Sequence, residues 1–304
     1  MAGYVFKRVF IALITLWIII TITFLLMHSI PGDPFADEKR IPAEIRANLD
    51  AKYGLDKPLI EQYYIYIKNL LRGDLGISLK YKNRSVNEMI YKGFPVSLKL
   101  GGAAAVVGIS MGVLFGIIAG IKRGMPPDYF VIFIAILGVS VPSFVFASLF
   151  QYFFAAKLRW LPVAGWGGIA TLILPTFALG LRMIAYLARM MRTSMLDVLG
   201  QDYIKTAKSK GLNDFEVITG HTLRNAITPI ITVTGVQIAG ILVGSFVIES
   251  IFNIPGTGKY LVSAVKDSDY TVILGMTVFY AAILVVMMFI IDMLYLIVDP
   301  RVKL

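Results

Sequence analysis

Residues 9–30 read VFIALITLWIIITITFLLMHSI and contain no Asp, Glu, Lys or Arg. A helix needs about 20 mostly apolar residues to cross the hydrocarbon core of a bilayer, and this stretch is long enough. Lys7 and Arg8 precede it, as basic residues precede a signal peptide. However, the apolar run is longer than a signal peptide needs, and no A-x-A cleavage site follows it. The stretch therefore predicts an uncleaved membrane-spanning helix.

The rest of the chain repeats this pattern. Of its 304 residues, 57% are hydrophobic and 16% are charged, against about a quarter charged in ordinary soluble domains. Six charge-poor runs are long enough to span a bilayer, and backbone groups in lipid must form their hydrogen bonds within the segment. The sequence therefore predicts an all-α polytopic membrane protein with six transmembrane helices. The predicted spans are residues 9–30, 95–121, 129–156, 172–191, 226–248 and 271–298.

The formal charge of +10 comes from Lys and Arg residues scattered between the apolar runs. Nucleic-acid binding requires a concentrated basic patch, so positively charged loops on a membrane protein are the better interpretation. The chain has no cysteine, which excludes disulfides, thiolate metal sites and a cysteine nucleophile. By the positive-inside rule, basic residues predict that both termini are cytoplasmic. These residues are Lys7, Arg8, Lys122, Arg123, Arg301, Lys303 and those of the stretch 189–224.

We expect three regions along the chain. Residues 1–30 hold the N-terminus and the first helix, residues 31–94 form an extracellular cap, and residues 95–304 form the membrane core. Aromatic and aliphatic residues recur between Tyr53 and Leu70, and residues 61–71 have helical character. A connection of this length is too long for a tight turn, so we expect it to fold and either to contact a binding protein outside the membrane or to cover the entrance.

One cytoplasmic segment, residues 192–225, lies between the fourth and fifth spans. Its residues 200–216 read GQDYIKTAKSKGLNDFE. Residues 201–210 favour a helix, and Gly211 stands where a left-handed C-terminal cap would fall. Asn213 resembles an N-cap with Glu216 as its capping-box partner. The pattern predicts two short helices around a glycine turn, with Tyr203 and Ala207 on one face. By itself, such an element could simply close the end of the bundle.

The segment resembles the cytoplasmic "EAA" loop of bacterial ABC import permeases, through Ala207, three intervening residues and Gly211. The stretch DYIKTAKSKGL at 202–212 resembles the form of this loop in peptide permeases. Lys205 stands where the general motif has Glu, and that substitution is common in the peptide branch. The resemblance implies a coupling helix that docks in a groove of an ATPase subunit. The residues that carry it are Asp202, Tyr203, Lys205, Thr206, Ala207, Gly211 and Leu212.

Further motifs resemble the B-type permease subunit of the oligopeptide and dipeptide ABC importer family. In chain order they are PGDP at 31–34, YGLDKPL at 53–59, GDLGIS at 73–78, HTLRNA at 221–226 followed by Pro229, and DPR at 299–301. Each is short, but together and in this order they extend the resemblance over essentially the whole chain.

The resemblance implies a non-catalytic subunit in the cell membrane that translocates oligopeptides. Its implied partners are a second homologous, C-type permease, two ATPase subunits, an extracellular peptide-binding protein and membrane lipid, but no nucleic acid. It implies no cofactor on this chain, because ATP and Mg act on the ATPase subunits. Related permeases carry dipeptides, nickel chelates or oligosaccharides, so these remain alternatives. An ATP-independent secondary transporter is a further alternative, but such proteins often contain inverted repeats, and we detect none here.

Two other features of the sequence suggest catalytic or metal chemistry and are set aside. Residues 254–260, IPGTGKY, resemble a phosphate-binding loop, but Asn253 stands where that motif needs its first glycine. Tyr260 stands where the motif needs Ser or Thr, so we expect ATP hydrolysis to come from another polypeptide. His28 and His221 are far apart along the chain and predict no metal site.

Arg182 is the unusual charge within the predicted fourth span. It lies about ten residues into that span, or about 15 Å along a helix, which places it near the bilayer centre. An arginine facing lipid there costs at least about 2.5 kcal/mol. It should therefore face a partner such as Asp292, reach water because the span is shifted, or line a cavity. In the last case its guanidinium would suit a peptide carboxylate on the substrate pathway.

Overall fold

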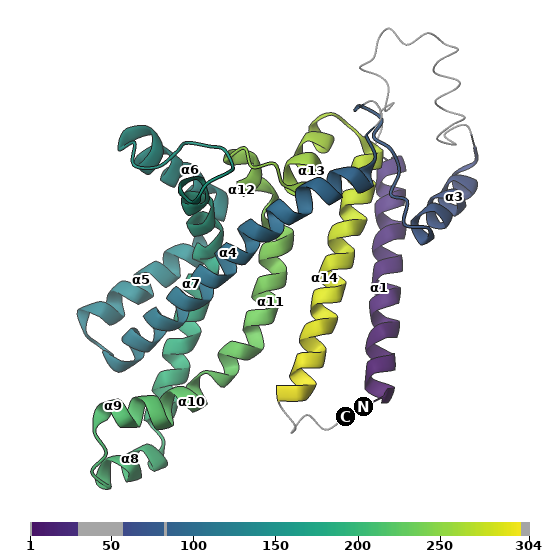
Figure 1. The fold of residues 1–304 in the computed structure, drawn as a ribbon. Coiled ribbons are helices and arrows are strands. Elements are labelled where there is room, and N and C mark those ends of the chain that lie inside the picture. Colours follow the sequence, from purple (N-terminus) through teal and green to yellow (C-terminus); the bar gives the residue numbers. More distant parts are fainter. Residues whose placement is uncertain (1, 30–56, 82–83, 299–304) are drawn as a thin grey trace. The chain divides into compact units, whose positions relative to one another are not determined.

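The computed structural model describes residues 2–29, 57–81 and 84–298. These residues form helices and no strand, which confirms the predicted all-α class (Figure 1). The predicted motifs at 31–34 and 299–301, and most of that at 53–59, lie outside the described residues. The chain divides into two compact units, one made of Met1–Pro95 and Gly256–Val286, the other of Val96–Pro255 and Met287–Leu304.

In the first unit, a short helix packs against a long one. Helix α3, Leu59–Leu71, confirms the helical stretch predicted after residue 60. It lies against α1, Ala2–Ser29, where the hydroxyls of Thr21 and Tyr63 are 2.7 Å apart. The ring of Phe24 also meets Tyr63 edge-on, with centroids 5.3 Å apart. The other helices of this unit are the start of α4 (Val86–Ile121), α13 (Thr257–Lys266) and the start of α14 (Tyr270–Val298).

A buried carboxylate organises the connection between α13 and α14. Asp269 is fully buried and caps α14 by accepting a hydrogen bond from the Val272 amide at 3.2 Å. It also accepts a hydrogen bond from the Ser78 hydroxyl. Nearby, the Tyr81 hydroxyl donates to the Asp267 carboxylate at 3.1 Å. The pKa of Tyr81 is raised, mainly by burial and then by the hydrogen bond to this carboxylate. The segment after α3 is therefore fastened to the start of α14.

The second unit is built around α7, Ile169–Leu199. This helix packs against the helices before it and after it, and Met183, Leu187, Met191 and Met195 are fully buried along its core side. Besides the remainders of α4 and α14, this unit contains a series of helices that follow one another along the chain. They are α5 (Pro126–Ser140), α6 (Ser143–Phe150), the π-helix η1 (Gln151–Lys157), α7, α8 (Asp202–Ser209), α9 (Asp214–Glu216), the π-helix η2 (Val217–Thr222), α10 (Leu223–Ala226), α11 (Thr228–Gly244) and α12 (Phe246–Ile251).

A row of glycines brings α4 against α7. Gly108, Gly112, Gly116 and Gly120 recur every four residues, so they lie on one side of α4. A Cβ on Gly112 would lie 2.8 Å from the Leu187 Cβ, and one on Gly120 would lie 2.6 Å from the Met195 Cβ. Small residues at this spacing let two membrane helices approach closely and pack through backbone contact. The row therefore fixes the position of α7 in this unit.

Among the described residues, four helices are long and apolar enough to cross a membrane: Gly3–Ser29, Val86–Ile121, Ile169–Leu199 and Tyr270–Met293. Two bent helix pairs raise the number to six if each pair is one span. Six predicted spans are therefore compatible with the structure. Two of the long helices extend beyond their predicted bounds, since α4 begins at Val86 rather than at residue 95, and α7 continues to Leu199 rather than ending at residue 191.

The predicted third and fifth spans are bent helix pairs rather than single continuous helices. The third is a pair of helices, Pro126–Ser140 and Ser143–Lys157, that meet at 109°. Pro142, between them, has no amide hydrogen to continue the helical pattern, and it disfavours helical backbone at Val141. The fifth is interrupted at both ends, by a 50° bend before Thr228 and by a break between α11 and α12. Proline again marks the first of these bends, at Pro229.

Candidate functional site

The first candidate site is the segment between α7 and α11, residues 200–227, which we call the coupling segment. Its first helix, α8, ends at Ser209, and Gly211 follows with a φ of 85°. The Gly211 amide donates to the Lys208 carbonyl at 3.0 Å, and the Leu212 amide donates to the Ala207 carbonyl at 3.4 Å. These two bonds form a Schellman cap, which needs a residue with positive φ. The predicted left-handed glycine cap is confirmed.

The second short helix of the coupling segment begins with the predicted capping box. The Asn213 side chain accepts from the Glu216 amide at 2.9 Å, and the Glu216 carboxylate accepts from the Asn213 amide at 2.9 Å. Two backbone amides that would otherwise lack partners at the helix start are thereby satisfied. The chain therefore reverses direction between α8 and α9 through two local motifs, both recognisable in the sequence.

A small apolar core holds the coupling segment together. Ile204, Ala207 and Val217 are buried against one another, with Val198 and Leu212 packed beside them. Val198 belongs to α7, so this core joins the segment to the end of that helix. Tyr203 lies one turn before buried Ala207 on α8, as predicted, and its side chain is exposed. The four-residue spacing carries it to the edge of the buried face.

Polar contacts also tie the coupling segment to α7. The Ser194 hydroxyl of α7 donates to the Ala226 carbonyl of α10 at 2.8 Å. The Asn225 amide of α10 donates to the Tyr203 hydroxyl of α8 at 3.0 Å. After α9, the coupling segment continues through the π-helix η2, a rare helical form that often occurs at functional sites. The segment is thus a folded unit closed at its base.

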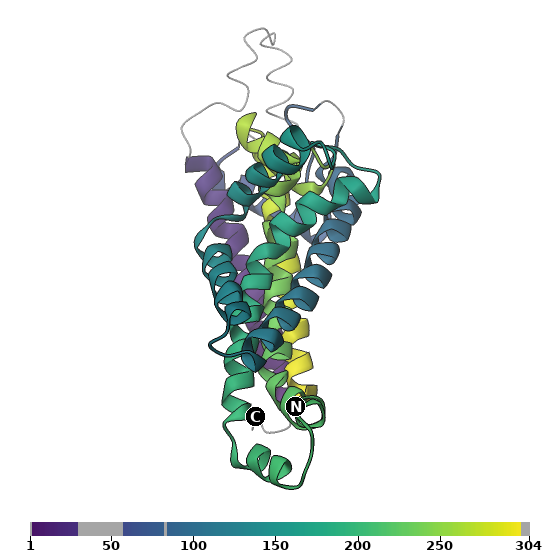
Figure 2. The same cartoon turned by 90° about the vertical axis from the view of Figure 1, so that its left-hand side faces the viewer.

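The outer surface of the coupling segment carries most of the residues that the resemblance singles out. Asp202, Tyr203, Lys205 and Thr206 are exposed, whereas Ala207 is buried and Leu212 is half-buried. The first four can therefore contact a partner, while Ala207, Gly211 and Leu212 shape the turn. Figures 1 and 2 show α8 and α9 beyond the end of α7, where they project from the other helices of their unit.

Sequence reasoning missed Phe215 on this surface. Its side chain is 75% exposed at the tip of the coupling segment, beside the ion pair of Lys208 and Asp214, whose atoms are 2.9 Å apart. A large exposed aromatic side chain on a projecting turn is typical of a residue that a protein partner covers. Its position between the two capping-box residues, two after Asn213 and directly before Glu216, is the signal that could have revealed it.

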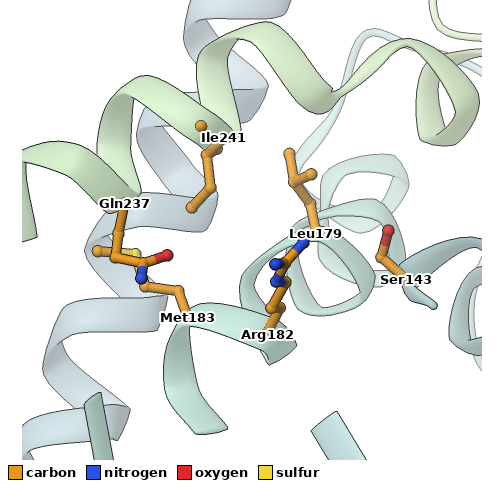
Figure 3. Close-up of a pocket in the computed structure, with 7 residues that line it drawn as sticks. Ser143, Leu179, Arg182, Met183, Gln237 and Ile241 are labelled. Carbon is orange, nitrogen blue, oxygen red and sulfur yellow. The ribbon is translucent and has the colours of Figure 1, made fainter. Parts of the chain in front are cut away.

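The second candidate site is a cavity of about 210 Å³ between α6, α7 and α11, which we call the α7 cavity. It is lined by Ser143, Leu179, Arg182, Met183, Gln237, Gly240 and Ile241. Figure 3 shows the polar side chains approaching one space from three helices, Arg182 from α7, Gln237 from α11 and Ser143 from α6. The structure therefore places Arg182 at a cavity, as one of the predicted alternatives required.

The polar groups of the α7 cavity have no partners within the described part of the chain. The side chains of Arg182, Gln237 and Ser143 form no hydrogen bond or ion pair with any residue that the structure describes. The alternative in which Arg182 pairs with Asp292 was therefore wrong. Sequence reasoning also missed Gln237 and Ser143, because residues on three helices meet only after the chain folds.

A different arginine of α7 forms the ion pair in this unit. Arg192 donates two hydrogen bonds to the Asp128 carboxylate, one of them from Nη2 to Oδ2 at 2.9 Å. Asp128 is buried at the start of α5 and also accepts from the Gly124 amide at 2.9 Å. Two hydrogen bonds from one guanidinium to one carboxylate fix the relative orientation of the two side chains as well as stabilising their contact. The ion pair joins the connection between α4 and α5 to α7, near the coupling segment.

Comparison with known families places the chain. The sequence model of the family described as "Binding-protein-dependent transport system inner membrane component" matches residues 112–304. That of the corresponding N-terminal region, "Binding-prot-dependent transport system membrane comp, N-term", matches residues 1–101. The chain belongs to this family. It is a membrane-embedded permease, and the predicted resemblance to the peptide-importer branch has support from curated relatives.

The relatives of this permease match over their whole length. A protein of Bacillus subtilis named dipeptide transport system permease protein DppB is 47% identical over 304 residues, covering 100% of this chain and 99% of the relative. The oligopeptide transport system permease protein OppB of Escherichia coli K12 is 42% identical over 305 residues and covers 100% of both. The permease therefore has the same extent as the peptide-transport subunits that it resembles.

Solved structures support the fold of the permease. A chain of an amino acid ABC transporter crystallised with histidines superposes with a TM-score of 0.53, at 19% identity, over 71% of this permease and 95% of that chain. A chain of the inward-facing MetNI methionine ABC transporter gives a TM-score of 0.56, at 15% identity, over 69% and 96%. At these identities the comparison concerns the fold alone, and it extends over about two thirds of the permease.

Proposed function

We propose that this permease is the B-type membrane subunit of an ATP-driven importer of peptides. The support is its similarity, at 40–47% identity over the full chain, to permeases named for dipeptide or oligopeptide transport. These names favour peptides over nickel chelates and oligosaccharides, and they leave dipeptides and longer peptides as equal candidates. A binding protein outside the membrane delivers the peptide, and a homologous C-type permease completes the pathway.

The observation that carries this proposal is the folded coupling segment. A projecting turn with its own apolar core, a charged rim and exposed Phe215 is suited to a protein groove. In the importer that we propose, two ATPase subunits bind ATP and Mg, and one of them receives this segment. A secondary transporter would have no use for such a docking element. The chain itself supplies no hydrolytic group.

The long helix α7 provides the route by which ATP binding acts on the membrane region. Arg182 at the cavity and Val198 in the core of the coupling segment lie on this one helix, about 24 Å apart at helical rise. Closure of the ATPase subunits moves the coupling segment, and α7 carries that movement to the cavity. The bundle then converts from an inward-facing to an outward-facing state. In this scheme both termini and the coupling segment are cytoplasmic.

Reconstitution tests the proposal. Proteoliposomes would contain this permease, its partner permease and the two ATPase subunits, with the binding protein and a labelled tripeptide on the external side. We expect peptide to accumulate when ATP is present on the side of the coupling segment. Omitting the ATPase subunits or replacing ATP by a non-hydrolysable analogue should abolish accumulation, because this chain hydrolyses no nucleotide.

Two results would contradict the proposal. Accumulation driven by an ion gradient, without ATP, would make the permease a secondary transporter. ATP-dependent accumulation of a nickel chelate or an oligosaccharide, with no accumulation of any dipeptide, tripeptide or pentapeptide, would retain the importer class and reject the substrate class.

A further inference from the structure

We propose that the α7 cavity is a transient binding site for the C-terminal carboxylate of the peptide on its way through the membrane. This inference rests on the proposed function, because it assigns a role within peptide import. It begins from the three side chains that meet at the cavity, Arg182, Gln237 and Ser143. Their chemistry, their lack of partners among the described residues and their convergence on one cavity point to the same ligand.

The chemistry of the α7 cavity fits one end of a peptide. The planar guanidinium of Arg182 can donate two parallel hydrogen bonds to a carboxylate. The amide of Gln237 can donate to a peptide carbonyl and accept from a peptide N–H, and the hydroxyl of Ser143 can do either. The described residues lining the cavity include no Asp or Glu that would compete for the guanidinium. The set therefore favours an anionic terminus with an adjoining peptide bond.

The lack of internal partners indicates that these groups serve something outside the chain. Polar and charged groups within membrane spans almost always face a partner, water or a pathway. Arg182, Gln237 and Ser143 lie on helices that are apolar along most of their length, yet none of their side chains bonds to the part of the chain that the structure describes. A peptide terminus can supply the hydrogen bonds that these side chains do not form within the described part of the chain.

The size and the lining of the cavity limit which part of a peptide it can bind. A volume of about 210 Å³ is below the 300–1,000 Å³ that is usual for pockets enclosing a whole small molecule. It accommodates a terminal group rather than an entire peptide. Leu179, Met183 and Ile241 form apolar walls, and methionine adapts to differently shaped side chains. Such a site recognises the carboxylate shared by all peptides and tolerates variation in the last residue.

The principal competing explanation is a structural one, in which Arg182 pairs with an acidic residue of the partner permease. Removal of the charge would then impair all substrates alike. A carboxylate site makes a narrower prediction, since only substrates with a free terminus lose an interaction. The comparison of a peptide with its C-terminal amide separates the two explanations.

The experiment measures ATP-driven uptake of a tripeptide and of its C-terminal amide by the complete reconstituted importer. The variants are Arg182→Gln, Arg182→Lys and, as a matched control, Arg189→Gln. Arg189 is exposed on α7 about two turns from Arg182 and does not line the cavity. Every sample uses the same binding protein. The substrate preference of that protein therefore cancels when the uptake of each substrate by a variant is divided by its uptake by the unmodified importer.

We expect Arg182→Gln to lower uptake of the free acid about tenfold, as for loss of a hydrogen bond to a charged group, and to leave amide uptake within about twofold. Arg182→Lys should show a smaller loss, confined to the free acid, because lysine keeps the charge without the paired geometry. Arg189→Gln should affect the two substrates equally.

An equal loss for acid and amide in Arg182→Gln, with normal assembly, would overturn the inference. So would the same selectivity in Arg189→Gln. If Arg182→Gln does not reach the membrane, Arg182→Lys provides the test. Uptake of the free acid by Arg182→Lys equal to that by the unmodified importer would then overturn the inference. Failure of the unmodified importer to move either peptide would instead reject the proposed function.

Discussion

The coupling segment and the α7 cavity are built in opposite ways. In the coupling segment, the Schellman cap at Gly211 and the capping box at Asn213 satisfy the backbone within a few residues. In the cavity, Ser143 and Gln237 come from helices far apart in the chain, and their side chains have no partners among the described residues. The first is a closed unit with its own core, and the second is an opening between helices.

This contrast indicates a division of labour. A closed unit can be moved as one piece, whereas an opening between three helices changes whenever one of those helices moves. Helix α7 belongs to both, since it ends at the core of the coupling segment and passes the cavity near its middle. The glycine row of α4 packs closely against the core side of α7. We therefore expect α7 to act as a rigid connection between the two sites.

The largest effect should come from breaking the support of α7. In Gly116→Val, the new Cβ would overlap the Met191 Cβ and lie within 2.7 Å of the Ala188 carbonyl oxygen. Neither backbone can yield easily, so overpacking should cost about 1–3 kcal/mol or more. We expect little folded subunit in the membrane and a lower thermal midpoint of the purified complex, measured by dye-based unfolding in detergent.

The matched control for this prediction is Gly102→Val, in the same helix. A Cβ at Gly102 meets nothing within 4 Å, so valine there changes helix propensity without a clash within the chain. Equal loss of membrane-inserted protein in the two variants would show that the glycine row does not hold α7.

A smaller and more selective effect should follow from Gly211→Val. At a φ of 85°, a β-branched residue costs about 1–2 kcal/mol, and the Schellman turn must change shape to relieve it. The open space around this position means that strain, and not a clash, is the cause. We expect normal amounts of permease in the membrane, with peptide uptake and peptide-stimulated ATP hydrolysis each reduced about tenfold.

Gly220→Val is the control within the same segment. Gly220 also has open space around it, but its φ is not positive, so valine should be tolerated. If Gly211→Val retained full uptake and full stimulation, the turn would not be required for coupling. If both glycine variants were equally impaired, surface bulk rather than backbone strain would be responsible.

The predictability of the two sites from sequence follows from the same contrast. Gly211, Asn213 and Glu216 act through neighbours a few residues away, so their conformations could be predicted from spacing alone. The α7 cavity could be predicted only in part. A charge in the predicted fourth span required Arg182 to face a partner or a cavity, but nothing local connects it to Gln237 or Ser143.

The bends and the ion pair of the core show a similar limit. Pro142 marks the break in the predicted third span, but the 109° angle depends on how α5 and α6 pack against α7. Arg192 was visible only as one of several basic residues, and its pairing with Asp128 depends on α5 folding back along α7. Tyr203 shares a face of α8 with Ala207 as predicted, but its exposure depends on how Ile204 and Val217 pack and could not be predicted from the spacing.

The most direct test of the connection between the two sites uses the absence of native cysteine in this chain. Ser143→Cys introduces one thiol at the α7 cavity with little change in size, in an importer whose partner subunits are also cysteine-free. Its reaction rate with a membrane-impermeant thiol reagent is measured from each side, with and without ATP trapped on the ATPase subunits. We predict that ATP lowers the rate from the cytoplasmic side and raises it from the external side, and that Gly211→Val removes this response. A response of the same size in Gly211→Val, or no response in the importer without that substitution, would contradict the account.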